Sequence, residues 1–486
     1  MEETVSVVFD DTVTKSDVIK DVIGNKGFSG VIFQKRTLCS RYCDAVSKMF
    51  LVADWRVATS TFELDALSEQ IGEWPAQRRI LHCFSNFVVV DEDRLALTYR
   101  KISFVDEPYA ILSEGEIAAV MFANLSQYQA FLSEIRKSRS SVLSAKDIRG
   151  HCEAEGLKNI ASVENFSQCI SGRMDTRYFN SLCGDEYTLV KSSGNVRKIK
   201  AEYEYYNLLP DDMRIWFVRP YGYQESGSIA SYKMERLHVT DLAVKWVHGS
   251  IQEDEFSRIL AKYFHFIVTR QSRGVHRNQY DTTAQALYVD KVRSRINELK
   301  GMASFKPIAL LLQACPKIKD IDSLFGRYMK LKERVERRQS YPLVSVIGHG
   351  DPCFSNVLYN RTAQIFKFID PKGALTEDEL WTNPYYDLAK ISHSICGLYD
   401  FYNNDLFDIK VDADLSIRAA VDFDNAPYLR MFRQQVEANG YDYMTVRVYE
   451  ASLFLSMLPL HIDNPRKVLG FVLNAARILE EIEDEL

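Results

Sequence analysis

The sequence has little of what marks a membrane, secreted or zinc-binding protein. Its longest purely apolar stretches, such as IALLL from Ile308, are far shorter than the roughly eighteen residues of a bilayer-spanning helix. The N-terminal MEETVSVVFDD is acidic and lacks the basic and apolar regions of a secretory signal. Of nine scattered cysteines only Cys39 and Cys43 lie close together, with no second pair to complete a zinc site. We therefore expect reduced thiols, no membrane span and a cytoplasmic location.

An excess of basic charge is also absent. The chain has 486 residues, a formal net charge of −6 and 46% hydrophobic residues, which is typical of a folded protein of two to four domains at roughly 100 to 200 residues each. The basic run GRYMKLKERVERR, from Gly326, contains interspersed acidic residues and is interpreted as a solvated helix face. The composition thus predicts no nucleic-acid partner, and it leaves the oligomeric state open.

Residues 1–150 are predicted to form a small α/β domain of unknown role, because VSVVF and GVIF read as strands between helical patterns. FVVVDEDRLALTYRKISF, from Phe87, resembles a hairpin, and EGEIAAVMFANLSQYQAFLSEI, from Glu114, has a helical pattern. The polar stretch KSRSSVLSAKD, residues 137–147, is the predicted boundary. FDDTV resembles the start of an aspartate-based phosphatase, but Asp10 and Asp11 are adjacent where that motif needs an intervening residue.

The segment VSVIGHGDPCFSNVLYNRTAQIFKFIDPKGA, from Val344, carries the chemistry. Asp351 follows an apolar strand, Asn356 lies five residues later, and Asp370 ends a second apolar strand. Phosphoryl transfer from a nucleotide needs a carboxylate that orients the attacking hydroxyl, and oxygen ligands that hold magnesium against the phosphates. Each aspartate alone could belong to a surface turn, but their joint spacing indicates a phosphotransferase site.

HGDPCFSN followed by IDPKG is similar to the paired signature of the choline kinase and aminoglycoside phosphotransferase superfamily, relatives of protein kinases. NPYYDLAKISHSICGLYDFY, from Asn383, resembles the segment that follows there. The resemblance implies an α+β, bilobal, protein-kinase-like fold, with a small β-rich lobe over residues 158–237 and a large helical lobe over 238–486. It also implies ATP and Mg²⁺ as cofactors.

By this resemblance Asp351 is the catalytic base, and Asn356 and Asp370 are the magnesium ligands. His349 is expected to brace the loop by hydrogen bonding rather than to transfer a proton. Asp387, in YDLAK, is expected to tie a helix to the catalytic loop.

The sheet lobe should supply the remaining nucleotide contacts. Lys191 ends the apolar strand of EYTLVKSS, where its ammonium could reach the nucleotide phosphates. RKIKAEYEYYNLLP reads as a helix, and Glu202 is the first candidate partner for Lys191, matching the lysine–glutamate pair of kinases. Glu204 is its rival.

Two further segments have weaker signals. SYKMERL, from Ser231, resembles the hinge between lobes, where main-chain groups near Glu235 and Leu237 would meet the adenine edge; an exposed end of a core strand is the alternative. Ser171 to Asp175 occupies the place of the phosphate-covering turn but does not match GxGxxG, so an ordinary hairpin turn is equally plausible.

The residues around the motif, SNVLY, IDPKG and YDLAK, look more like those of phosphotransferases associated with bacterial surface-polysaccharide synthesis than like those of antibiotic-resistance enzymes or eukaryotic choline kinases. The predicted partner is therefore a small-molecule hydroxyl acceptor, in the first place a sugar or sugar derivative. Choline, ethanolamine or an aminoglycoside is the alternative, because Tyr399 to Tyr402 could form an aromatic and acidic pocket for a cation or could simply pack a helix. A non-catalytic nucleotide-binding scaffold, with activity or docking in the N-terminal domain, is the alternative of another class.

Overall fold

The computed structural model describes residues 4–137, 148, 150–170, 180–185, 187–338, 342–413 and 416–486. Two compact units emerge, Met1–Met174 and Asp175–Leu486, called unit 1 and unit 2 below. The division lies later than the predicted end of the first domain at 150, because strands β9 (Gly150–Glu153) and β10 (Leu157–Asn159) pair with strands of unit 1. Nearly all of the polar stretch predicted as the boundary lies outside the described residues.

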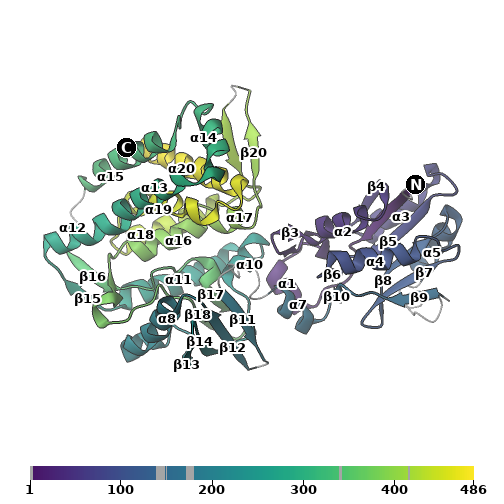
Figure 1. The fold of residues 1–486 in the computed structure, drawn as a ribbon, viewed down its shortest axis with the longest axis horizontal. Coiled ribbons are helices and arrows are strands. Elements are labelled where there is room, and N and C mark those ends of the chain that lie inside the picture. Colours follow the sequence, from purple (N-terminus) through teal and green to yellow (C-terminus); the bar gives the residue numbers. More distant parts are fainter. Residues whose placement is uncertain are drawn as a thin grey trace. The chain divides into compact units, whose positions relative to one another are not determined.

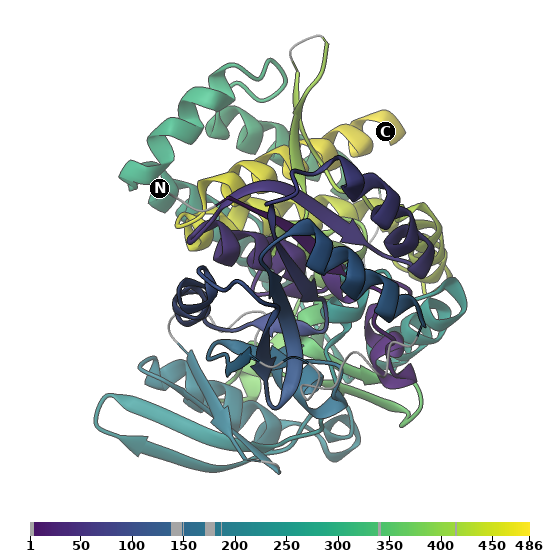
Figure 2. The ribbon, with the colours of Figure 1, turned by 90° about the vertical axis from the view of Figure 1, so that its right-hand side faces the viewer.

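Unit 1 is built on a six-stranded mixed sheet of order β4-β1-β5-β8-β7-β9 (Figure 1). The central strand β1 runs parallel to β4 and β5, and β8 is antiparallel to β5. Helices α3 and α5 pack on one another and on the sheet, whereas α2 packs against α4, so helices flank the strands as Figure 2 shows. The strands are β1 (Thr4–Asp10), β4 (Leu51–Ala58), β5 (Arg79–Phe84), β7 (Tyr109–Ser113) and β8 (Glu116–Phe122), and the helices are α1 (Asp17–Ile23), α2 (Leu38–Ser47), α3 (Thr61–Gln70), α4 (Glu92–Ile102), α5 (Leu125–Lys137) and α7 (Val163–Ile170). The α/β class predicted for this segment is confirmed.

Two local predictions in unit 1 are wrong. The segment predicted as a hairpin forms the short strand β6 (Phe87–Val89) and then α4, because the carboxylate of Asp91 caps the helix by accepting from the backbone N–H groups of Asp93 and Arg94. The helix predicted from Glu114 begins instead as strand β8, whose apolar run EIAAVMF is buried between β5 and β7. Burial in a sheet overrides the helical pattern there.

Unit 2 begins with an antiparallel four-stranded sheet of order β11-β12-β14-β13, covered by helix α8. Ile199 of α8 packs with Ala230, Tyr232 and Met234 of the sheet. The elements are β11 (Asn180–Gly184), β12 (Thr188–Ser193), α8 (Val196–Leu208), α9 (Asp211–Arg214), β13 (Pro220–Ser226) and β14 (Ile229–Glu235). The turn predicted to cover the phosphates, Ser171 to Asp175, lies outside the described residues.

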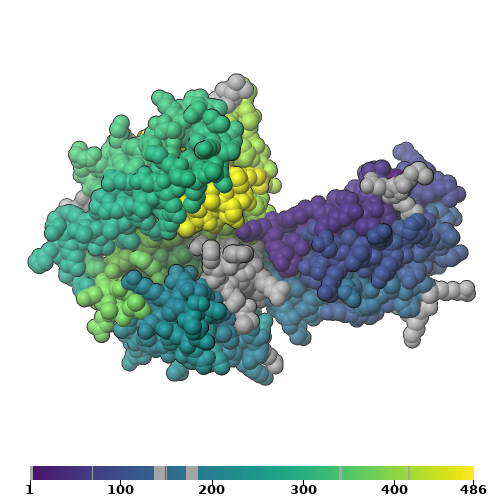
Figure 3. Space-filling view, in the orientation of Figure 1, coloured from purple at the N-terminus to yellow at the C-terminus, as the bar shows by residue number. Residues whose placement is uncertain are grey.

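The rest of unit 2 is mainly helical. Its residues, coloured from teal through green to yellow, make up much of the visible face of unit 2 in Figure 3. Helix α19 is buried along almost its whole length and packs against α13, α15, α16 and α20. The helices are α10 (Leu242–Val247), α11 (Glu253–Thr269), α12 (Arg277–Gln285), α13 (Lys291–Gly301), α14 (Lys306–Gln313), α15 (Ile321–Glu336), α16 (Tyr386–Ile395), α17 (Tyr399–Asn403), α18 (Ala426–Ala438), α19 (Tyr443–Met457) and α20 (Pro465–Glu485). The predicted α+β fold, with a sheet-bearing lobe followed by a helical part, is confirmed.

Small sheets carry the predicted catalytic segment through this helical part. Strand β16 (Val344–Ile347) lies between β15 (Ser272–Gly274) and β19 (Trp381–Thr382), and β17 (Val357–Asn360) forms a hairpin with β18 (Ile365–Phe368). A further hairpin joins β20 (Asp408–Val411) and β21 (Ile417–Ala420). Across the described ranges, no helix combines the length and the apolar character needed to cross a bilayer.

Candidate active site

A buried lysine joins the sheet lobe to the catalytic segment. Lys191 Nζ, on β12, lies 2.7 Å from Glu202 Oε2 and 2.8 Å from Asp370 Oδ1. Burial alone would lower the pKa of Lys191, but the charges of Asp370 and Glu202 outweigh it and raise the pKa. Of the two candidate partners on α8 it is therefore Glu202, not Glu204, that faces the lysine.

Asp370 is fixed by an unusual backbone. Its φ of 54° lies in the left-handed region, which few non-glycine residues adopt. Gly373, with φ 90°, comes so close to α8 that a Cβ there would lie 2.8 Å from the carbonyl carbon of Ala201 and 2.9 Å from the backbone nitrogen of Glu202. The chain after Asp370 therefore rests against the helix that carries Glu202, which holds the three charged groups together.

The His349 side chain connects two parts of the catalytic segment by hydrogen bonds from the loop between β16 and β17. Its Nδ1 accepts from the backbone N–H of Asp351 (3.0 Å), so Nε2 carries the proton and donates to the carbonyl of Ile369 (3.0 Å). The ring is fully buried, and burial lowers its pKa. A neutral imidazole thus links the residue that precedes Asp370 to the backbone of Asp351.

Asp387, at the start of α16, anchors the same loop from the other side. Its carboxylate accepts from the backbone N–H groups of His349 (3.0 Å) and Gly350 (2.8 Å), and Arg270 Nη1 lies 2.7 Å away. Arg270 also donates to the carbonyl of Pro384 (2.7 Å). Both Asp387 and Arg270 have fully buried side chains, so this ion pair is held by additional hydrogen bonds, as a buried charge requires.

Asn356 lies at the base of the β17–β18 hairpin. Its side-chain Nδ2 donates to the backbone carbonyl of Asp351 (2.8 Å), and its backbone carbonyl accepts from the backbone N–H of Ile369 (3.0 Å). With Nδ2 committed to the loop, Oδ1 is the atom left to act as an oxygen ligand. The three residues predicted to carry the chemistry, Asp351, Asn356 and Asp370, are therefore brought together by one set of backbone contacts.

Asp351 and Asp370 keep contact with solvent although the loop around them is buried. Their side chains are 38% and 40% exposed, respectively. Lys390 Nζ, on α16, lies 2.8 Å from Asp351 Oδ1. Burial would raise the pKa of Asp351, but Lys390, ahead of the other neighbouring groups, lowers it, and the pKa falls to about 2. Asp351 is thus ionised at neutral pH, with one oxygen paired and the other available.

Sequence reasoning missed Lys390 and Arg270. Lys390 stands within the quoted YDLAK, three residues after Asp387, which places both on one face of α16. A lysine on the face that already carries a predicted structural aspartate was a signal that could have been used. Arg270 has no local signal, since it directly follows α11, more than a hundred residues before its partner Asp387.

The predicted hinge residues lie between the sheet and the helices. Glu235 ends β14 and is exposed, Leu237 is half-buried, and Arg236 between them donates its backbone N–H to the carbonyl of Tyr187 (3.0 Å). A pocket beside Glu202 and Asp370 has mainly aromatic and aliphatic walls, formed by Tyr205, Tyr206, Phe217, Val218, Pro220, Tyr232, Met234, Phe368, Ile369 and Pro371.

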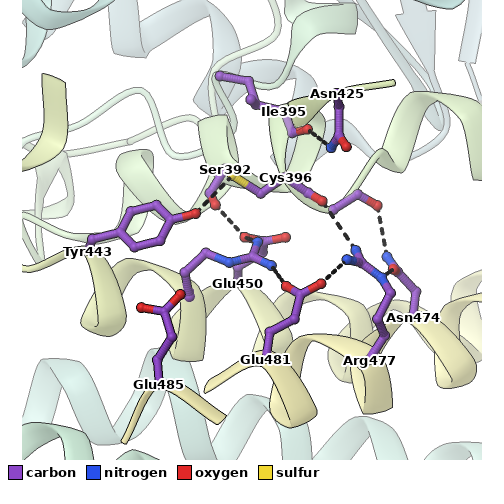
Figure 4. Close-up of polar contacts among 12 residues, drawn as sticks. Ser392, Ile395, Cys396, Asn425, Tyr443, Glu450, Asn474, Arg477, Glu481 and Glu485 are labelled. Atoms are coloured by element: carbon purple, nitrogen blue, oxygen red, sulfur yellow. Dashed lines mark hydrogen bonds and ion pairs between the residues drawn. The ribbon is translucent and has the colours of Figure 1, made fainter. Parts of the chain in front are cut away.

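The C-terminal end of α16 is held by a polar network from three other segments (Figure 4). Its last carbonyls accept from side chains that follow in the chain: Ile395 O from Asn425 Nδ2 (3.0 Å), Cys396 O from Arg477 Nη2 (3.2 Å) and Gly397 O from Asn474 Nδ2 (2.8 Å). These donors satisfy carbonyls that a helix end leaves without intrahelical partners. The helix that carries Asp387 and Lys390 is therefore fixed at both ends.

Glu450 is the buried acid of this network. Its Oε2 is bonded to Ser392 Oγ and to Arg447 Nη1, while its Oε1 has no hydrogen-bond partner among the described residues. Burial raises the pKa of Glu450 to about 7, although Arg447 and Ser392 act to lower it.

The residues proposed for a cation pocket pack inside unit 2. All of Tyr399, Asp400, Phe401 and Tyr402 are buried. Tyr399 stacks on His393 with ring centroids 4.5 Å apart, and Tyr402 packs on Phe407 at 4.9 Å. This arrangement favours the helix-packing alternative for α17.

Comparison with known proteins gives distant matches. No protein-family model and no curated protein matches the sequence. Among solved structures, LicA in complex with AMP is 11% identical, with a TM-score of 0.37 over 65% of this chain and 92% of that one. Aminoglycoside phosphotransferase APH(4)-Ia is 12% identical, with a TM-score of 0.34 over 62% of this chain and 94% of that one. A thermostable mutant of that enzyme, in a ternary complex with ADP and hygromycin B, gives 11% and 0.34 over 62% and 94%. At this level of similarity, what the chain does is inferred from its own contacts.

Proposed function

We propose that unit 2 is an ATP- and magnesium-dependent phosphotransferase that phosphorylates a hydroxyl group of a small acceptor, in the first place a sugar or sugar derivative. The observation that carries the proposal is Lys191 Nζ held between Glu202 and Asp370 (2.7 and 2.8 Å), with Asp351 in the adjoining loop. Phosphoryl transfer requires a cation for the phosphates, oxygen ligands for magnesium and a carboxylate for the attacking hydroxyl. Lys191 can supply the first, Asn356 and Asp370 the second, and Asp351 the third.

Each residue then has a separate task. Lys191 neutralises the nucleotide phosphates, and Glu202 keeps its ammonium in place. Main-chain groups near Glu235 and Leu237 receive the adenine. The donor set fits magnesium, which prefers oxygen ligands and keeps phosphate oxygens in its coordination shell: Asn356 Oδ1 and the Asp370 carboxylate would hold the ion, which would neutralise charge on the phosphates.

Asp351 receives the acceptor hydroxyl. Since its pKa is about 2, the carboxylate is a weak base, so it orients the hydroxyl first and takes the proton only when the bond to phosphorus is well advanced. Such a late transfer suits a loose transition state, in which catalysis is mainly positioning and charge stabilisation. His349 and Asp387 position the loop and do not exchange protons with the acceptor.

The test is acceptor-dependent turnover. The full chain is incubated with Mg²⁺ and ATP labelled at the γ-phosphate, against sugars, sugar acids, choline, ethanolamine and aminoglycosides, and ADP and labelled product are quantified. We expect turnover with at least one acceptor, and its loss in Asp351→Asn. Asp212→Asn, an exposed carboxylate on α9, is the matched control and should behave as the unmodified chain. Tight ATP binding without turnover for any acceptor would instead support the nucleotide-binding scaffold.

A further inference from the structure

Asp351 forms an ion pair with a lysine of helix α16. Lys390 Nζ lies 2.8 Å from its Oδ1. Tyr386 stands four residues before Lys390 on α16 and so shares its face. The Tyr386 hydroxyl in turn accepts from Lys291 Nζ (3.0 Å), whose ammonium also lies 5.6 Å from the centre of the tyrosine ring. Lys291, Tyr386 and Lys390 therefore form a continuous row that ends at Asp351, called the lysine row below.

The position of Lys291 is fixed by its helix. It follows a π-helical turn, Ala286–Asp290, an irregularity often found at functional sites. Tyr288 in that turn stacks on Tyr449 with ring centroids 3.6 Å apart, and its hydroxyl donates to Asn383 Oδ1 (3.1 Å). Asn383 lies just before α16, so the turn that presents Lys291 is tied to the helix that carries the rest of the row.

Among the described residues, no carboxylate neutralises the charge of Lys291. Lys291 is exposed, and no carboxylate among the described residues lies within ion-pair distance of it. Lys372, also exposed and likewise without such a partner in the described part of the chain, packs its aliphatic stem against Gly350, next to Asp351: a Cβ on Gly350 would lie 2.5 Å from Lys372 Cβ. Burial would raise the pKa of Tyr386, but Lys291 and Lys390 outweigh it and lower the pKa, as expected for a phenol between two cations.

We propose that the lysine row is the acceptor subsite, and that it selects an acceptor carrying an anionic group, a carboxylate or a phosphate, in addition to the hydroxyl that is phosphorylated. The inference rests on the proposed function and names the substrate class of that site. Lys390 is already paired with Asp351 and positions it, whereas Lys291 is available to the acceptor. A cationic acceptor such as choline would meet like charge here, and the aromatic residues that could have caged it are buried in packing.

The experiment compares acceptors that share a sugar ring and differ in charge. Initial rates with ATP and Mg²⁺ are measured for glucose, glucosamine, glucuronic acid and glucose 6-phosphate, with choline as a further arm. We expect kcat/KM to be at least tenfold higher for glucuronic acid or glucose 6-phosphate than for glucose, and lowest for glucosamine and choline. The two anionic arms distinguish a carboxylate from a phosphate.

Variants then assign the preference to the row. Lys291→Met should raise KM for the preferred anionic acceptor about tenfold and thereby remove most of its advantage over glucose, and Lys291→Arg should restore the low KM. Lys306→Met, an exposed lysine on α14, should change neither. Equal or better use of glucose, glucosamine or choline, or an unchanged preference in Lys291→Met, would overturn the inference and leave the proposed function standing. Absence of turnover with every acceptor would overturn the proposed function itself.

Discussion

In both units aspartates lie at the end of a strand or in the loop that follows it, but their surroundings differ. In unit 1, Asp10 is fully buried: its Oδ1 accepts from the backbone N–H and the hydroxyl of Thr12 (2.9 and 2.7 Å), and its Oδ2 lies 3.5 Å from His82 Nε2. In unit 2, Asp351 and Asp370 are about two-fifths exposed and each contacts a lysine ammonium. A buried carboxylate whose hydrogen bonds all come from the protein stabilises a turn. A partly exposed carboxylate beside a lysine can also bind a ligand from solution.

The strongest test of this contrast replaces one aspartate in each unit. Asp351→Asn should lower phosphoryl transfer by roughly 10³-fold, because the amide cannot accept the hydroxyl proton, while ATP binding changes little. Asp10→Asn should leave transfer by the folded protein unchanged but lower the free energy of unfolding by about 1–3 kcal/mol, because a buried hydrogen-bond set is disturbed. Steady-state kinetics and denaturant unfolding of both variants provide the measurements. Full activity in Asp351→Asn would contradict the assignment.

Replacing the central lysine should have the next largest effect. Lys191→Met removes the cation between Glu202 and Asp370 and leaves two carboxylates facing one another. We expect kcat/KM for ATP to fall by about 10²-fold, the order seen when one preorganised charge-stabilising group is lost. Lys198→Met is the control: this half-exposed lysine lies 3.5 Å from Glu202, and its loss should cost only a few-fold. A similar loss of kcat/KM for ATP in both variants would mean that positive charge near Glu202 is sufficient, and that the position of Lys191 between Glu202 and Asp370 has no special role.

The same contrast shows what the sequence can and cannot predict. Asp351, Asn356 and Asp370 lie within twenty residues, so their spacing along two apolar strands was readable. The helix α8 was also predicted, with Glu202 as the first candidate partner of Lys191 and Glu204 as its rival. Lys390 was overlooked because its partner is set by how α16 lies against the loop. In unit 1, the helical pattern of EIAAVMF was misread, since burial between β5 and β7 decides its conformation. The spacing of Lys390 from Asp387 on α16 could have been read, but neither the contact of Lys390 with Asp351 nor the burial of EIAAVMF is visible in local spacing.

Glu450 extends the comparison to buried acids within unit 2. With its pKa raised to about 7 from an ordinary value near 4.3, the folded protein binds a proton more tightly than the unfolded chain between these values. Its contribution to stability is therefore complete at low pH and is lost as the pH rises from about 4.5 to about 7. The buried His349 and His393, whose pKa values are lowered, act in the opposite direction, so the variant must be compared with the unmodified chain at each pH.

In Glu450→Gln this loss should disappear. The stability of the variant relative to the unmodified chain should rise with pH across that range by roughly 2–3 kcal/mol, the equivalent of about two pKa units. Thermal unfolding at pH 5, 6 and 7 measures the difference. A difference independent of pH would show that Glu450 is ionised throughout.

Two buried serines give the smallest and most discriminating effect. Ser85, at the end of β5 in unit 1, is fully buried and its hydroxyl has no partner among the described residues, whereas the Ser392 hydroxyl is bonded to Glu450. Ser85→Ala should leave stability unchanged or raise it by up to about 1 kcal/mol, because an unsatisfied polar group is removed. Ser392→Ala should lower the free energy of unfolding by about 1–3 kcal/mol, because Glu450 loses a donor. Since both substitutions remove the same hydroxyl, equal losses in the two variants would mean that Ser85 is hydrogen-bonded in solution, for example to a buried water, and that the two units satisfy their buried polar groups in the same way.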